Sequence, residues 1–178
     1  MAWTAPSTVV AGQTLSAAFW NEQVRDNLTE LAPFFAAWTS YTPTWAATTT
    51  NPVIGDGSIS GRYLAVGKFV QVKILIEPGS TTTFGSGYYL LSPPTGLKPR
   101  RDTVATGHVN ITGSAMINQP GVANYFFAGV GYGATPFGST DNFIAHTTTG
   151  AFNPWTPASP VTFANGNIFQ GHWIYEAE

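Results

Sequence analysis

The sequence contains no cysteine, which excludes a disulfide framework and any metal site built from thiolates. Charge is also scarce, because charged residues make up 9% of the chain against about 25% in an average domain. Such a surface depends on threonine, serine, asparagine and glycine for its solubility, so copies can pack together with little desolvation of charge. We therefore expect a protein that assembles with copies of itself. We also expect no bound cofactor.

Three further absences narrow the class of protein. No apolar run approaches the roughly 20 residues that span a bilayer, so we expect no membrane segment. The seven lysines and arginines are scattered, and only Arg100 and Arg101 are adjacent, so no basic stripe predicts binding to nucleic acid. Residues 1–4 lack the charged and apolar regions of a secretory signal. We expect the protein to be made in the cytoplasm and to leave the cell by lysis.

The N-terminal part of the chain predicts an extended arm over residues 1–13 and a helix that follows it. Ser16 is a suitable N-cap, and Pro33 stops the helix near Leu31. Apolar residues recur at helical spacing, but about four turns with one apolar stripe are not stable alone. This stripe must pack against the rest of the domain or against other copies. The predicted assembly and attachment residues are Phe19, Trp20, Val24, Leu28 and Leu31.

From Tyr41 onward the helical periodicity disappears, and short β-rich runs alternate with turn residues. Gly67-Lys68 separates the two clearest runs and predicts a tight hairpin. This spacing predicts a mainly β fold, an antiparallel β-sandwich of jelly-roll-like type, preceded by one short helix. We divide the chain into an arm and helix, 1–38, and a β-sandwich domain, 39–178. The predicted strands are Ser58–Val66, Phe69–Glu77, Gly87–Leu91, Thr103–Thr112, Tyr125–Tyr132, Phe143–Ala145 and Ile168–Tyr175.

The polar residues form no pattern that predicts catalysis. Glycoside hydrolysis needs two facing carboxylates, and the acidic residues of the β-region are separated and lie beside turn residues. We interpret Asp56, in Ile54–Gly57, as a turn residue. The histidines lack the spacing of metal ligands. We therefore predict no enzyme and no metal site. The residues considered are Asp56, Asp102, Asp141, His108, His146 and His172.

Aromatic side chains are the one enriched chemistry, at 14% of the chain. Most of them suit a core or an interface between subunits. Aromatic rings also bind the apolar faces of sugars, and three of them stand in proline- and glycine-rich segments rather than in predicted strands. We therefore consider a receptor-contact loop, with a host cell-wall glycan as a candidate partner. Its residues would be Phe137, Phe152 and Trp155.

Several segments together resemble small virion proteins of phages that infect actinobacteria, the minor tail, tail-fibre and receptor-binding proteins. The similarity covers both ends and the first half of the β-region, whereas residues 103–165 carry little of it. These segments mark a building block rather than one position on the particle. They are Ala11–Asn21, Val24–Leu28, Tyr41–Trp45, Thr50–Pro52, Gly55–Gly57, Gly61–Tyr63, Gly67-Lys68, Gly79–Gly87 and Trp173–Ala177.

The resemblance implies a homotrimer in the virion, with the helix near a threefold axis or docked on tail or capsid proteins. The exposed β-domain would then be a tail-fibre or receptor-binding component. A capsid decoration or head-fibre protein is the alternative within this class. A carbohydrate-binding module or a glycan hydrolase is the alternative from another class. It would require an exposed row of aromatics or two acidic side chains in one groove.

Overall fold

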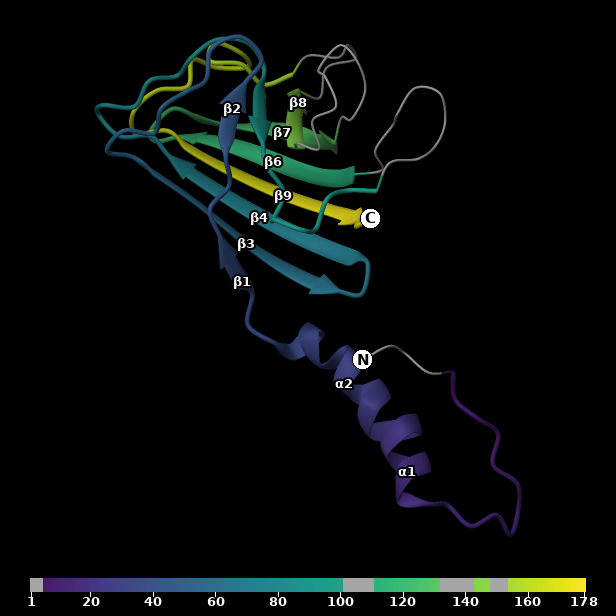
Figure 1. Ribbon diagram of the computed structural model, residues 1–178. Coiled ribbons are helices and arrows are strands. Elements are labelled where there is room, and N and C mark those ends of the chain that lie inside the picture. The colour runs from purple at the N-terminus through teal and green to yellow at the C-terminus, as the bar shows by residue number, and fades with distance from the viewer. Residues whose placement is uncertain (1–4, 101–110, 132–142, 148–153) are drawn as a thin grey trace.

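The computed structural model describes residues 5–100, 111–131, 143–147 and 154–178. The described chain is mainly β, and one short helical segment precedes the strands (Figure 1). The helical segment begins after Ser16 and changes its winding along its length. Its parts are α1 Ala17–Trp20, the π-helical η1 Asn21–Asp26, α2 Asn27–Leu31 and the 3-10 turn η2 Ala32–Phe35.

Within the described residues, nine strands pair in the order β1-β3-β4-β9-β6-β7-β8-β5-β2, and every pair is antiparallel. The C-terminal strand lies in the middle of this order, whereas β1 and β2 are at its ends. The strands are β1 Thr39–Tyr41, β2 Trp45–Ala47, β3 Ser58–Val66, β4 Phe69–Glu77, β5 Tyr89–Leu91, β6 Ile111–Gln119, β7 Ala123–Gly131, β8 Phe143–Thr147 and β9 Ile168–Glu176.

The β3–β4 hairpin confirms the prediction made from Gly67-Lys68. Val66 pairs with Phe69 across a two-residue turn, and Gly67 has a φ of 56°. A two-residue turn with a positive φ at its first central position matches the right-handed twist of the strands, and glycine adopts that φ without a clash at Cβ. The turn sets the register of nine residue pairs along both strands.

Strands β6, β7, β8 and β9 form a Greek key. The first three follow one another as antiparallel neighbours, and β9 returns to pair with β6. Strand β9 also pairs with β4, so it joins the Greek key to the β3–β4 hairpin. A jelly roll contains two Greek keys, and the described strands contain this one, so the sandwich is confirmed and its jelly-roll type stays a prediction.

The far end of the strand order folds over the large sheet and makes the second layer of the sandwich. Strands β2 and β5 pair with each other, and β5 meets β8 through the pair Leu91 and Phe143. In Figure 1, β2 crosses in front of the large sheet instead of continuing it. The space between the two layers is filled by a core that is rich in aromatic rings.

Trp155 lies at the centre of this core. Its ring stacks on Phe169 of β9 at 4.0 Å between centroids and on Trp45 of β2 at 6.5 Å. The Tyr89 amide of β5 donates to the Trp155 carbonyl at 3.0 Å. Trp155 therefore connects the small layer to the large sheet, and its side chain is only 1% exposed.

Strand β4 shows how the two faces of the large sheet differ. Its alternating pattern buries one set of side chains in the core and leaves Lys73 exposed on the opposite face, with Gln71 and Leu75 half-buried beside it. The small layer covers the first face, and the second is the open face of the sheet. The buried set is Val70, Val72, Ile74 and Ile76.

The sequence predicts a strand over Thr103–Thr112, of which 103–110 lie outside the described residues and Ile111 and Thr112 begin β6. The rest of β6, residues 113–119, was not predicted, and its first residue is a glycine, which usually weakens a strand. In this fold a Cβ at Gly113 would lie 2.1 Å from the His172 carbonyl oxygen. The close approach of β9 therefore requires glycine in the middle of β6. The short strands β1 and β2 had no sequence signal.

Candidate functional site

The N-terminal helix begins as the sequence predicts. The Ser16 hydroxyl accepts a hydrogen bond from the Phe19 amide at 3.1 Å, which satisfies one of the free N–H groups of the first turn. Pro33 ends the α-helical winding, because α2 stops at Leu31 and the chain continues as one 3-10 turn. Both boundaries of the predicted helix are therefore confirmed.

The apolar stripe of this helix is exposed in the single chain. Phe19 is half-buried, whereas the other predicted assembly residues are exposed by 38–61%. Phe34 and Phe35, in η2, extend the same kind of surface, and Phe35 is 90% exposed. Most of the large exposed hydrophobic side chains lie in this part of the chain. They are Val9, Val10, Leu15, Trp20, Val24, Leu28, Leu31, Phe34 and Phe35.

The helix projects away from the β-domain (Figure 1). It meets that domain through its last turn, where η2 contacts β3. The sequence left open whether the stripe packs on the rest of the domain or on other molecules. In the single chain the stripe is not covered by the β-domain, which favours the second possibility.

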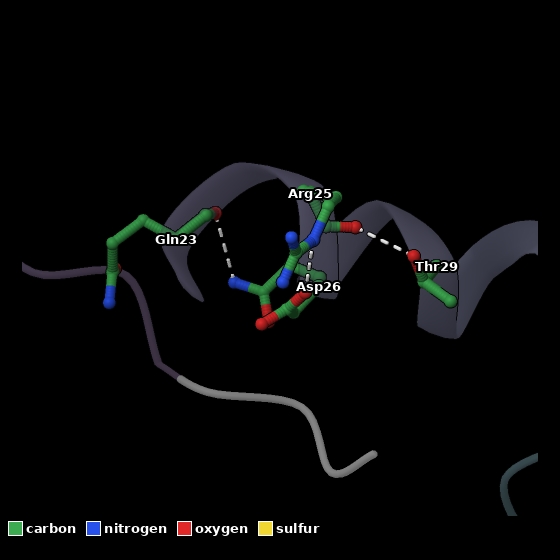
Figure 2. Close-up of polar contacts among 5 residues, drawn as sticks. Gln23, Arg25, Asp26 and Thr29 are labelled. Atoms are coloured by element: carbon green, nitrogen blue, oxygen red, sulfur yellow. Dashed lines mark hydrogen bonds and ion pairs between the residues drawn. The ribbon is translucent and has the colours of Figure 1, made fainter. Parts of the chain in front are cut away.

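The π-helical turn η1 is fastened by side chains of the next turn (Figure 2). The side-chain nitrogen Nδ2 of Asn27 donates to the backbone carbonyl of Gln23 at 3.2 Å, and the Thr29 hydroxyl donates to the backbone carbonyl of Arg25 at 2.8 Å. Arg25 also pairs with Asp26 at 2.7 Å. A π turn changes the backbone hydrogen-bond pattern, and these side-chain donors add hydrogen bonds to carbonyls of the turn.

The arm runs beside the helix, and its described residues 5–13 form neither helix nor strand. The Ser7 amide donates to the Gln23 side-chain oxygen at 2.7 Å, which ties the arm to η1. Asn27 is 5% exposed although it belongs to a projecting helix. The arm and the helix therefore act as one unit, with one side covered by the arm and the apolar stripe exposed.

A second candidate site is a groove on the open face of the large sheet. Its volume is about 670 Å³, and it crosses the strands from β3 to β7. Two rows of facing residues line it. The first row contains Arg62, Lys73, His172 and Ser114, and the second contains Ser60, Leu75, Gln170, Met116 and Phe126.

The first row of the groove is positively charged. Arg62 and Lys73 are directly paired across β3 and β4, and Lys73 is paired with His172 across β4 and β9. The Lys73 ammonium lies over the Trp38 ring at 4.9 Å from its centroid, a cation–π contact that fixes its position. Among the described residues that line the groove, none is an aspartate or a glutamate.

His172 is held within this row by Gln71, whose side-chain nitrogen lies 2.7 Å from the ring Nε2. Partial burial lowers the pKa of His172, and the nearby charge of Lys73 lowers it further. The Gln71 nitrogen can only donate, so Nε2 of the neutral ring accepts this hydrogen bond and the N–H at Nδ1 remains as a donor.

The predicted receptor-contact loop is not supported at its described residue. Trp155 was expected in an exposed loop, but it is a core residue, so this expectation was wrong and a receptor contact through Trp155 is not proposed. Proline and glycine neighbours suggested exposure, although the ring itself is large enough to fill the space between two layers. Phe137 and Phe152 lie outside the described residues.

The carboxylates and histidines were predicted to be separate. Asp56 is confirmed as a turn residue between β2 and β3. Its carboxylate accepts hydrogen bonds from Ser80 and Thr81, which follow β4. In the described part of the chain, no three potential metal-ligating side chains of histidine, aspartate or glutamate gather together. Asp102, Asp141 and His108 lie outside the described residues, and the side chain of His146 is not described.

The groove residues were not singled out from the sequence. The hairpin signal could have found the Arg62–Lys73 pair, because a two-residue turn at Gly67-Lys68 places those residues opposite each other. His172 could not have been added in this way, since its neighbour depends on the long-range pairing of β4 with β9.

Comparison of the chain with family models, with curated proteins and with solved structures found no match. None of the helices described here is both long and apolar enough to cross a membrane. The arguments that follow therefore rest on the residues and their geometry.

Proposed function

We propose that this chain is a structural protein of a bacteriophage virion, present as a homotrimer in a minor tail or tail-fibre component. In this proposal the arm and helix attach the subunit to its own copies and to other virion proteins. The β-domain faces outward and contacts the host. A capsid decoration or head-fibre position uses the same parts in the same way. The observation that carries the proposal is the exposed apolar stripe on the projecting helix.

The stripe has a clear energetic reason to be covered. Burying one leucine, valine or aromatic side chain contributes about 1.5–3 kcal/mol, and five stripe residues lie along this short helix. An isolated helix of this length is marginal in water. Packing of the stripe against the equivalent stripes of two further copies would stabilise the helix and the assembly together.

The composition supports the same proposal. The chain has seven basic and nine acidic residues, so repulsion between copies is weak. The acidic residues of the helix recur every four positions, at Glu22, Asp26 and Glu30, and the apolar stripe recurs at a different set of positions. Neighbouring helices can therefore bury the stripe while these carboxylates remain in water.

The alternative from another class is a glycan hydrolase or a free carbohydrate-binding module. Hydrolysis by a carboxylate pair requires two acidic side chains in one groove. The described lining of the groove contains Arg62, Lys73 and His172 instead, which favours binding over hydrolysis.

The proposal is tested by the mass of the purified full-length chain at micromolar concentration. Light scattering or native mass spectrometry should give three times the chain mass of 19.0 kDa. A stable monomer under these conditions would contradict the proposal. Electron microscopy of intact virions with the subunit labelled then distinguishes a tail position from a capsid position, and absence of label from the particle would exclude both.

A further inference from the structure

The groove on the open face contains a charge arrangement that the fold alone does not explain. Arg62 and Lys73 face each other directly on adjacent strands, and like charges in this position destabilise a sheet. The ion pairs found among the described residues join Arg25 to Asp26 and Arg100 to Glu176, and neither of them involves the groove. An anionic ligand would relieve this repulsion.

We propose that the groove binds an acidic polysaccharide and holds an oxyanion of the sugar chain, a carboxylate or a phosphate, between Arg62 and Lys73. The guanidinium of Arg62 can bind either oxyanion through two parallel N–H donors. Lys73 adds a charge whose position the Trp38 ring fixes. The inference rests on the proposed function for one point, that this face is exposed on the assembled particle.

The remaining lining suits a sugar chain rather than a peptide. Ser60, Ser114 and Gln170 are exposed and can donate to or accept from hydroxyl groups. Phe126 is 66% exposed in the same groove, and a flat ring of this kind packs against the apolar face of a pyranose.

The backbone around the groove also disfavours a peptide. The middle strands of the groove, β4, β9 and β6, are each paired on both sides, so a peptide could not add itself to the sheet there. The groove crosses from β3 to β7, which is four strand spacings or roughly 19 Å, and this length accommodates an extended oligosaccharide.

The experiment measures binding by calorimetry on the purified full-length chain at low salt, with three probes. The probes are a uronic-acid oligosaccharide, an oligosaccharide that carries phosphate groups and a neutral oligosaccharide of the same length as the first. We expect one of the anionic probes to bind and the neutral probe to bind at least tenfold more weakly. The identity of the probe that binds distinguishes a carboxylate from a phosphate.

The double variant Arg62→Gln/Lys73→Gln should weaken binding at least tenfold while circular dichroism shows the same β-sheet content as in the parent. Lys68→Gln is the matched control, because Lys68 is an exposed cation at the end of the same hairpin and does not line the groove. Phe126→Ala should also weaken binding, which a purely electrostatic surface would not show.

Four results would overturn the inference: no binding of either anionic probe, equal binding of the neutral probe, the same loss in Lys68→Gln, or a double variant that binds normally. If the double variant changes the oligomeric mass and no probe binds, Arg62 and Lys73 form contacts between copies of the chain instead. The mass measurement is independent, so a trimer that binds no glycan refutes this inference alone, and a monomer that binds one refutes the proposed assembly alone.

Discussion

Asp56 shows how a single carboxylate can organise two turns. One of its oxygens accepts from the Ser80 hydroxyl at 2.7 Å, and the other accepts from the amide and the hydroxyl of Thr81, each at 2.8 Å. The hydrogen bond from the Thr81 amide is the main cause that holds the pKa of Asp56 well below its usual range, and the two hydroxyls add to it. The charged form of this residue is thus favoured by the fold.

Asp56→Asn should lower the melting temperature at neutral pH, because an amide accepts these hydrogen bonds less strongly than a carboxylate. The folded-state pKa is lowered, so the stabilisation is present above the ordinary pKa of 3.8 and is lost as pH falls through the lowered value. The difference in melting temperature between parent and variant should therefore narrow below about pH 4, as thermal unfolding at pH 7, 4 and 2 can measure.

Glu77→Gln is the control, because it removes a carboxylate that binds one hydroxyl. An equal fall in melting temperature in Glu77→Gln would contradict the role of Asp56.

Trp155→Ala should destabilise the β-domain by about 3–5 kcal/mol, because it removes a buried ring from between the two layers. Denaturant unfolding followed by fluorescence or circular dichroism measures this loss. The exposed Phe126→Ala is the comparison, with an expected change within about 0.5 kcal/mol. Equal stability of the two variants would contradict the assignment of Trp155 to the core.

At the residue scale, the sequence predicts local roles better than exposure. Ser16 as N-cap, Asp56 as turn residue and Gly67 in a hairpin were all found, because each depends on neighbours a few residues away. Trp155 was misassigned because its burial depends on Trp45 and Phe169, which are distant in sequence.

At the scale of elements, the helical segment separates stability of the domain from assembly. The stripe lies on a segment that reaches the β-domain through η2 and β3. Changes on the stripe should thus affect contacts between molecules and leave the strands intact. Leu28 is the sharpest position for a test, since it is 61% exposed in the single chain.

Leu28→Asp should convert the proposed trimer to monomers at micromolar concentration while the β-sheet circular dichroism is retained. The loss of about 2 kcal/mol of apolar burial per copy corresponds to more than tenfold weaker association. Sedimentation or light scattering measures the oligomer. Ala18→Asp places the same carboxylate at an exposed position on the charged side of the helix, four residues before Glu22 and seven before Arg25, and should assemble normally. Normal assembly of Leu28→Asp would show that the stripe is not the interface.

Strand prediction succeeded where an element and its partner are close in sequence. The bounds of β3 and β4 were predicted as observed, because β-branched runs flank a recognisable turn. The part of β6 after Thr112 was missed, because Gly113 is required by the approach of β9, a contact that no local pattern contains. Strands β1 and β2 are three residues long and are held by their partners rather than by propensity.

At the scale of the whole molecule, the fold class was predictable and the strand order was not. Alternating apolar patterns specify an antiparallel sheet with one covered face, whereas the pairing of β9 between β4 and β6 is decided by long-range packing. The groove belongs to this second category, since its rows combine residues from strands that are far apart in sequence.

The proposed assembly makes a prediction about thermal unfolding of the whole molecule. Because the helix is marginal alone, dissociation and helix melting should occur together, and their transition temperature should rise with protein concentration. The β-domain should unfold in a transition that does not depend on concentration. Circular dichroism over about a hundredfold range of concentration tests this. A single transition that is independent of concentration would argue against assembly through the helix.

The central place of β9 has a consequence for synthesis on the ribosome. The arm and helix precede the β-domain in the chain, so the exposed apolar stripe leaves the ribosome before the sheet can close. Strands β4 and β6 lack the neighbour between them until β9 emerges, and up to that moment their edges are open to strands from nearby nascent chains. In the proposed trimer, neighbouring ribosomes on one messenger RNA would therefore be well placed to bring the helices of three chains together before their β-domains have folded.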